Sequence, residues 1–177
     1  MQHGRHIVLI GPMGSGKSTL GSALAACLQR PFIDLDARIA AAAGRSIPAI
    51  FNNEGESGFR DRESRALLEA LDTPPSVIAT GGGAVMREAN RSAMRCAGWI
   101  AWLDVTPDVQ LARIAGDDNR PLLDRDDPAQ ALAELQALRE PIYRALADFR
   151  LDTGVQDPAR LVELLATAFR QHEESRA

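Results

Sequence analysis

The sequence predicts an α/β fold of three layers, with a parallel sheet of about five strands between two layers of helices. Short apolar runs rich in β-branched residues alternate with longer helical segments along the chain, which is typical of βαβ units. Three helix starts are marked by a capping residue followed by proline, at Thr106-Pro107, Asp127-Pro128 and Asp157-Pro158. No internal repeat or linker interrupts the pattern, so we expect residues 1–177 to form a single domain.

The composition excludes several classes of protein. The chain of 177 residues is 45% hydrophobic and 25% charged, with a net charge of −4, so no global positive field attracts nucleic acid or anionic membranes. No apolar run approaches the length of a membrane span or a signal peptide. We therefore expect a cytoplasmic protein without a nucleic-acid or membrane partner. Cys27 and Cys96, the two cysteines, lie in predicted helices and are expected to be buried thiols.

The first predicted strand, residues 6–10, leads directly into the segment GPMGSGKST at 11–19. This segment fits the phosphate-binding pattern G-x-x-x-x-G-K-[ST] at every fixed position, and residues 20–28 after it carry leucine at helical spacing. The strand–loop–helix context favours a phosphate site over a chance glycine-rich turn. Backbone N–H groups and the helix N-terminus would bind phosphate oxygens there. The nucleotide-binding residues predicted from this loop are Gly14, Ser15, Gly16, Lys17, Ser18 and Thr19.

Lys17 is the only lysine of the chain, since every other basic residue apart from histidine is arginine. A compact point charge therefore stands where the pattern needs one. We expect Lys17 to reach the β- and γ-phosphates and Ser18 to offer its hydroxyl to Mg²⁺.

Asp34 and Asp36 end the second predicted strand, in Phe32-Ile33-Asp34-Leu35-Asp36. Residues i and i+2 of a strand point to one side, so both carboxylates are expected to leave the strand end together. One could help to hold Mg²⁺ or accept a hydroxyl proton, and the other could bind substrate hydroxyls. The alternative is that Asp36 only caps a helix that begins at Ala37.

Two segments do not fit the alternation of strands and helices. The first, at about 37–65, is helical but interrupted by Gly44, Pro48 and Gly55, and the second, at about 116–125, is short and polar. Ligands of open parallel sheets bind beyond the carboxyl ends of the strands. We therefore interpret the first segment as a substrate-binding insertion and the second as a mobile lid.

Arginine and glycine residues complete the candidate site. Arg60 could simply pair with Glu56 on a solvated helix face, or its guanidinium could bind a substrate carboxylate in bidentate fashion. Gly81, Gly82 and Gly83 follow the predicted strand 77–79, and close approach of a ligand to the backbone explains three glycines better than a simple turn. The other predicted strands are 99–103 and 149–151. Three further arginines lie in or beside the predicted lid, and together they could form an anion-binding cluster: Arg113, Arg120 and Arg139.

Other chemistries find no support in the sequence. The three histidines lie near the chain ends, no Cys/His cluster has zinc spacing, and no G-x-S-x-G elbow is present. A GTPase of the N-K-x-D kind would need a second lysine.

With these motifs in hand, the chain resembles the shikimate kinases of the bacterial type from Ile7 to about Ala168. A phosphate loop alone would not separate kinase families, but the combined set is specific. The matching motifs in chain order are residues 11–19, Asp34-Leu35-Asp36, Ile50-Phe51, Glu54-Gly55-Glu56, Gly58-Phe59-Arg60, Gly81-Gly82-Gly83, Arg120-Pro121-Leu122-Leu123, Arg139 and Tyr143-Arg144.

The resemblance implies a P-loop kinase fold and transfer of the γ-phosphoryl group of ATP to the 3-hydroxyl of shikimate, with Mg²⁺ as cofactor, in a monomer. It implies that Lys17, Asp34 and Arg120 are catalytic, and that Ser18 and Asp34 lie near the metal. Arg120 would close on the phosphates from the lid, and Arg113 would lie near the adenine. The implied substrate-binding residues are Asp36 for the ring hydroxyls, Arg60 and Arg139 for the carboxylate, and the backbone of Gly81, Gly82 and Gly83.

Three alternatives stay open on the sequence. A gluconate-type sugar-acid kinase shares the small P-loop fold and also needs arginine for a carboxylate. A nucleoside monophosphate kinase would need a base-reading pocket and usually a longer lid. A non-catalytic nucleotide-binding module is the third possibility, although Lys17, Asp34, Asp36 and Arg120 are all present.

Overall fold

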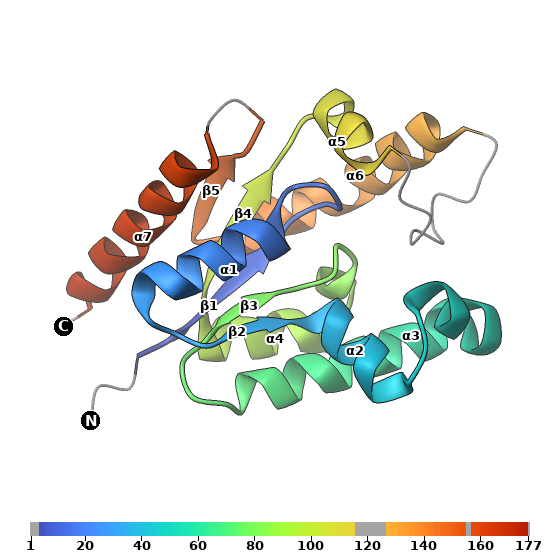
Figure 1. Cartoon of the computed structure of the whole chain (residues 1–177), viewed down its shortest axis with the longest axis horizontal. Helices are drawn as coiled ribbons and strands as arrows, with labels where there is room; N and C mark the ends of the chain where they lie inside the picture. Colours follow the sequence, from blue (N-terminus) through green and yellow to red (C-terminus); the bar gives the residue numbers. More distant parts are fainter. Residues whose placement is uncertain (1–3, 116–126, 155–156, 177) are drawn as a thin grey trace.

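A central sheet of five parallel strands organises the molecule (Figure 1). The computed structural model describes residues 4–115, 127–154 and 157–176. The strands are arranged in the order β2-β3-β1-β4-β5, and every neighbouring pair is parallel. Their bounds are β1 His6–Ile10, β2 Phe32–Asp34, β3 Val77–Ala79, β4 Gly98–Asp104 and β5 Phe149–Asp152.

Helices cover both faces of the sheet. On one face α1 and α7 pack against each other and against a core that contains Leu9 and Trp99. On the other face α3, α4 and α6 pack on a core that contains Val8 and Ile100. The helical elements are α1 Lys17–Leu28, α2 Leu35–Ala43, α3 Ile47–Leu71, the 3₁₀ turn η1 Ala84–Met86, α4 Glu88–Ala97, α5 Pro107–Ile114, α6 Pro128–Leu146 and α7 Pro158–Glu174.

The strand register explains why two separate cores form. Ile7 pairs with Trp99, and Val8 pairs with Ile100, so successive residues of β1 enter opposite cores. Because both faces are covered, the central strands β1, β3 and β4 are mostly apolar, and all five residues of β1 are buried. The predicted three-layer arrangement is confirmed, as are the positions of the five predicted strands.

The helix starts and interruptions also follow the sequence. Thr106, Asp127 and Asp157 are the N-caps of α5, α6 and α7, each followed by proline in the first turn. The expected helical insertion consists of α2 and α3. Gly44 ends α2 with a φ of 62°, and Gly55 kinks α3 with a φ of 68°, conformations that favour glycine. The expected lid at 116–125, with Arg120, lies outside the described residues.

The prediction of buried cysteines is wrong. Cys27 in α1 and Cys96 in α4 are both exposed. Each follows a buried residue, Ala25 and Met94 respectively, by two positions. Since two residues turn a helix by roughly 200°, the thiols point away from the core that these neighbours enter.

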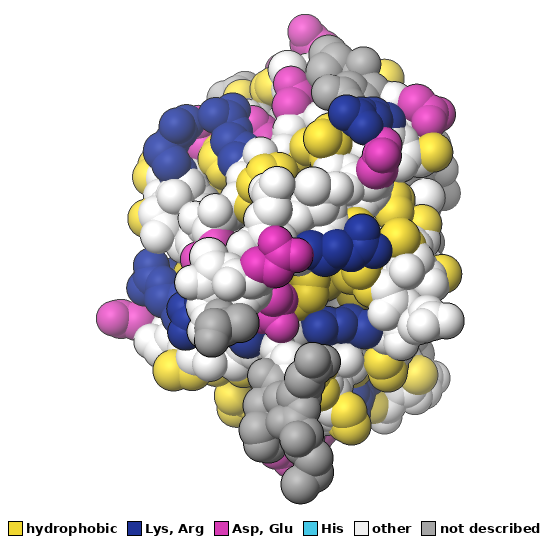
Figure 2. All heavy atoms as spheres, turned by 90° about the vertical axis from the view of Figure 1, so that its left-hand side faces the viewer, with side chains coloured by type: hydrophobic (Ala, Val, Ile, Leu, Met, Phe, Trp, Pro, Cys, Tyr) yellow, Lys and Arg dark blue, Asp and Glu magenta, His cyan; other side chains and the backbone are white. Residues whose placement is uncertain are grey.

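The face that carries both termini has no large region of one charge (Figure 2). Acidic and basic side chains are intermixed there with small hydrophobic areas. Within the described residues, no helix is both long enough and apolar enough to span a membrane.

His6 joins the start of β1 to the end of α3, and it is 6% exposed. The backbone N–H of Ser76 donates to His6 Nδ1 at 3.2 Å, so Nε2 carries the proton and donates to the carbonyl of Leu71, also at 3.2 Å. Burial lowers the pKa of His6, and the charge of Arg30 lowers it further. Protonated His6 would lose the bond from Ser76, because Nδ1 would no longer accept.

We expect this histidine to make the fold less stable in mild acid. Its folded pKa lies below the unfolded value of about 6.5, so its contribution is complete above that pH and is lost as pH falls through the folded pKa. Urea unfolding at several pH values between about 7.5 and 5 measures this for the wild type and for His6→Gln. The variant should be less stable by about 1–2 kcal/mol at the higher pH, and the difference should shrink on acidification. Parallel pH profiles would assign the acid sensitivity to other groups.

Candidate active site

The phosphate loop connects β1 to α1 and turns back on its own lysine. Gly14 and Gly16 have φ values of 74° and 90°, which lets the loop fold tightly before α1 begins at Lys17. The Lys17 ammonium group donates to the carbonyls of Gly11 at 2.8 Å and Pro12 at 2.7 Å. Lys17 is 9% exposed, so its charge is held inside the loop that the sequence pattern predicts.

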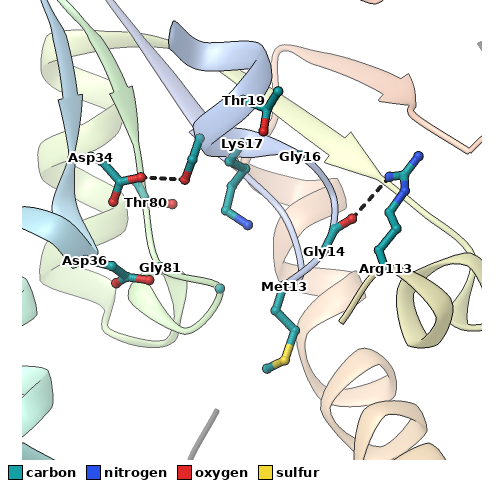
Figure 3. Close-up of a pocket in the computed structure, with 12 residues that line it drawn as sticks. Met13, Gly14, Gly16, Lys17, Thr19, Asp34, Asp36, Thr80, Gly81 and Arg113 are labelled. Atoms are coloured by element: carbon teal, nitrogen blue, oxygen red, sulfur yellow. Dashed lines mark hydrogen bonds between the residues drawn. The ribbon is translucent and has the colours of Figure 1, made fainter. Parts of the chain in front are cut away.

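A cavity of about 330 Å³ opens beside this loop, at the carboxyl ends of β1, β2 and β3 (Figure 3). It brings together both aspartates, two of the three glycines, Arg113 and the predicted phosphate-binding residues except Ser15, which is fully buried. The residues that line it are Met13, Gly14, Gly16, Lys17, Ser18, Thr19, Asp34, Asp36, Thr80, Gly81, Gly82 and Arg113.

Asp34 and Asp36 reach this cavity by a different route from the one predicted. The strand β2 ends at Asp34 and α2 begins at Leu35, so the two carboxylates do not share one side of a strand. Asp34 is the N-cap of α2, because its side chain accepts from the backbone N–H of Ala37 at 3.2 Å. The alternative that Asp36 caps this helix is therefore wrong. Asp36 lies in the first turn and lines the cavity with Asp34.

Ser18 and Asp34 form an oxygen-rich pair next to the phosphate loop. The Ser18 hydroxyl donates to Asp34 Oδ2, as the dashed line in Figure 3 shows. In the described part of the chain, no group of three or more His, Cys, Asp and Glu residues could hold a metal ion. Mg²⁺ does not need such a group, because it keeps several waters and binds one or two carboxylates together with substrate phosphates. The donor set of Ser18 and Asp34 therefore fits Mg²⁺ bound to a nucleotide.

Arg60 in α3 is buried rather than part of a solvated helix face. It is 8% exposed and donates to Glu63 at 2.8 Å and to Glu56 at 3.1 Å. The i,i+4 pair with Glu56 is thus present, but Glu63 is the fully buried partner. Burial lowers the pKa of Arg60, but the two carboxylates outweigh this effect and raise it overall. Burial also raises the pKa of Glu63, against the opposing charge of Arg60.

Glu63 was missed by the sequence analysis. The available signal was its position three residues after Arg60, which places both side chains on one face of the helix. Nothing in the sequence alone indicated that this face would be buried.

The three glycines after β3 have no side chains, so charged side chains of neighbouring helices can approach their backbone closely. A Cβ atom on Gly81 would lie 2.5 Å from Glu63 Oε1, one on Gly82 would lie 3.2 Å from Arg139 Nη1, and one on Gly83 would overlap the Arg60 guanidinium. The sequence suggested close approach of a ligand at this point. The structure shows that the side chains of the site itself approach this closely.

Arg139 and Tyr143 project from α6 toward the same glycine turn. Arg139 is 5% exposed, and the Tyr143 hydroxyl donates to the carbonyl of Gly82 at 2.5 Å. Burial raises the pKa of Tyr143 to about 12 despite the nearby charge of Arg139, so this phenol stays protonated and keeps donating at neutral pH. Trp102 stacks on Tyr143 from β4. The turn is therefore fixed from the sheet side as well as from α6.

Arg113 in α5 ties the phosphate loop to the segment after β5. Its guanidinium donates to the carbonyl of Gly14 at 3.1 Å, to the Thr153 hydroxyl at 3.2 Å and to the Thr153 carbonyl at 2.6 Å. Thr153 is 1% exposed and was not singled out by the sequence analysis, because the pattern of residues 152–158 is loose.

Comparisons with known proteins agree with this geometry. The family model described as "Shikimate kinase" matches residues 13–170. The shikimate kinase of Pseudomonas syringae pv. tomato is 47% identical over 163 residues, which are 92% of this chain and 95% of that protein. A solved structure, shikimate kinase from Acinetobacter baumannii in complex with shikimate, aligns with a TM-score of 0.93 at 38% identity, covering 96% of this chain and 94% of the other.

The gluconate-type alternative is less well supported. A gluconokinase from Sinorhizobium meliloti aligns with a TM-score of 0.66 at 20% identity, covering 99% of this chain and 97% of the other. At this identity the likeness shows a shared fold and no more. The match to the family model and the extent of the sequence identity show that the chain belongs to the shikimate kinase family.

Proposed function

We propose that the chain transfers the γ-phosphoryl group of ATP to the 3-hydroxyl of shikimate, giving shikimate 3-phosphate and ADP. The observation that carries the proposal is that a phosphate-binding site and a candidate substrate site share one cavity. A phosphate loop with a buried lysine opens into the same cavity as Asp34, Asp36 and the glycine turn, and two buried arginines lie against that turn. Membership of the shikimate kinase family supports the same assignment.

The nucleotide would occupy the loop end of the cavity. Backbone N–H groups of the loop would bind the phosphates, helped by the N-terminus of α1. Lys17 would exchange its bonds to the Gly11 and Pro12 carbonyls for phosphate oxygens. Ser18 and Asp34 would hold Mg²⁺, which supplies charge neutralisation on the phosphates. Arg113 would lie near the adenine, and Arg120, in the segment proposed as the lid, would approach the phosphates.

Shikimate would occupy the end that faces the glycine turn. Arg60 and Arg139 would bind its carboxylate, since planar guanidinium groups match carboxylates in bidentate geometry. Asp36 and the backbone of Gly81, Gly82 and Gly83 would bind ring hydroxyls. In this arrangement the accepting hydroxyl would lie near Asp34, between the two ends of the cavity.

The expected chemistry relies on positioning and electrostatics. Phosphoryl transfer through a loose transition state needs little covalent help from the protein. Lys17 provides a fixed positive charge at the site. The two carboxylates of the site belong to Asp34 and Asp36, which lie at the start of α2. Such preorganised groups cost no reorganisation at the moment of transfer.

The decisive experiment is a coupled ADP-release assay with a panel of hydroxy acids. Shikimate should be phosphorylated with the highest kcat/KM, and the product should be identified by mass spectrometry and NMR as the 3-phosphate. Faster turnover of gluconate would favour the sugar-acid kinase alternative. A rate of ADP release that does not depend on the added hydroxy acid would favour a nucleotide-binding module.

We expect the carboxylate of the substrate to be required. Shikimate methyl ester and shikimamide should react with kcat/KM lower by roughly 10- to 100-fold, because they lack the negative charge that the buried guanidinium groups of Arg60 and Arg139 would bind. The same assay measures this, with ATP saturating. Equal kcat/KM for the acid and its ester would mean that Arg60 and Arg139 do not bind the substrate carboxylate.

We propose that the enzyme acts in the cytoplasm as a monomer. The cavity described above is built from residues of one chain, so the proposed site does not require a second copy. Sedimentation velocity across a range of concentrations tests the monomer, and a constant sedimentation coefficient is expected.

A further inference from the structure

A small cavity lies between the phosphate loop, α5 and α6. Its volume is about 10 Å³, which is close to the ~10–15 Å³ that one water molecule requires. Its walls come from the loop and from the two helices on either side of the segment 115–127. The residues that line it are Pro12, Met13, Gln110, Leu132, Leu135, Gln136, Arg139 and Tyr143.

Three buried polar atoms of this lining have no hydrogen-bond partner in the part of the chain that the structure describes. They are Gln110 Oε1, Gln136 Oε1 and Arg139 Nε. Gln110 is 2% exposed and Arg139 is 5% exposed, so bulk solvent does not satisfy them. Folded proteins rarely leave buried polar groups unpaired, and here three such groups come from side chains around one cavity.

The three atoms match the hydrogen-bonding capacity of one water molecule. Arg139 Nε–H is a donor, whereas the two amide oxygens are acceptors. A water can accept one hydrogen bond and donate two, and buried waters typically make about three. A cation would be repelled by the Arg139 guanidinium, and an anion would face two carbonyl oxygens. We propose that one buried water occupies this cavity, bound by Gln110, Gln136 and Arg139, and that it positions Arg139 for the substrate.

The positioning role follows from the geometry of the guanidinium group and rests on the proposed function. Arg139 Nη1 lies near Gly82, on the side of the glycine turn. Arg139 also lines the small cavity, and its buried Nε has no hydrogen-bond partner among the described residues. A water that fixes Nε from behind would hold the planar group in the orientation that a carboxylate needs. Gln110 also packs on the phosphate loop, because a Cβ atom on Gly14 would lie 3.3 Å from its carbonyl and 3.5 Å from its Cγ. The water would therefore connect α5, beside the phosphate loop, with the substrate arginine on α6.

A crystal structure at a resolution that reveals ordered waters tests the site itself. We expect one density peak within hydrogen-bonding distance of Gln110 Oε1, Gln136 Oε1 and Arg139 Nε in the wild type, and no such peak in Gln136→Met, which removes an acceptor at similar volume. A dry cavity in the wild type would overturn the proposal, whatever the enzyme phosphorylates.

Steady-state kinetics test the positioning role. Gln136→Met should raise the KM for shikimate roughly tenfold, with the KM for ATP and kcat within about twofold of wild type. The preference for shikimate over its methyl ester should fall by a similar factor, which general loosening of the fold would not cause. Gln171→Met, at an exposed position of α7, is the matched control and should behave as wild type.

Three outcomes would count against the positioning role. An unchanged KM for shikimate in Gln136→Met, or an equal rise in the KM values for both substrates, would contradict it. If Gln136→Met does not fold, Gln110→Met carries the same expectation from the other helix. Arg139→Met separates the positioning role from the assignment of the site. Loss of shikimate binding in Arg139→Met, together with normal binding in both glutamine variants, would overturn the positioning role and leave Arg139 in the substrate site.

Discussion

Replacing Lys17 with methionine is expected to lower kcat by at least about 10³-fold. Methionine keeps the length of the side chain but removes the charge that would act on the phosphates as negative charge redistributes during transfer. Because Lys17 contacts the carbonyls of its own loop, the variant should also bind ATP more weakly. Single-turnover measurements with saturating nucleotide separate the two effects.

The fold of the Lys17→Met variant should remain intact. Its far-ultraviolet circular dichroism should match the wild type, and its free energy of unfolding should change by no more than about 1 kcal/mol. Arg65→Met is a suitable control, because it removes one positive charge from an exposed position of α3 that does not line the cavity. A Lys17 variant that turned over at a near-normal rate would contradict the assignment of the phosphate loop.

The parts of this structure that could be predicted are those coded by short segments of sequence. The strand β1, the loop after it and the start of α1 occupy consecutive residues, so their pattern is visible without knowledge of the rest of the fold. The same holds for the N-caps of α5, α6 and α7, where the capping residue and the following proline are neighbours. Local backbone chemistry decides these features.

The parts that could not be predicted depend on contacts between distant segments. Glu63 is an ordinary helical glutamate until the glycine turn of residues 81–83 packs against it. The route by which Asp34 and Asp36 reach the cavity depends on where β2 ends, and strand ends are set by pairing with β3. Gln110 and Gln136 became notable only because α5 and α6 place them around one cavity with Arg139. Burial of a polar group is a tertiary property, so propensity and spacing do not reveal it.

Asp34→Asn is expected to lower kcat by about 10³-fold while leaving the fold unchanged. Asparagine caps helices about as well as aspartate, so the bond from the Ala37 N–H to residue 34 can persist and α2 should begin at the same place. The carboxylate charge is lost, however, and an amide nitrogen would point toward either Ser18 or the metal. The variant should therefore fail to hold Mg²⁺ on the nucleotide and fail to accept the proton of the shikimate hydroxyl.

The dependence of kcat on Mg²⁺ distinguishes these two roles of Asp34. If the carboxylate acts mainly through the metal, raising the Mg²⁺ concentration should restore much of the activity of Asp34→Asn, and Ser18→Ala should show the same dependence because its hydroxyl shares the site. If the carboxylate mainly accepts the proton, high Mg²⁺ should restore little, and Ser18→Ala alone should respond to the metal. Asp72→Asn, which removes an exposed carboxylate at the end of α3, should leave both curves unchanged. Activity of Asp34→Asn within about threefold of wild type at all Mg²⁺ concentrations would exclude both roles, and the contact between Ser18 and Asp34 would then serve only to fix the start of α2 beside the phosphate loop.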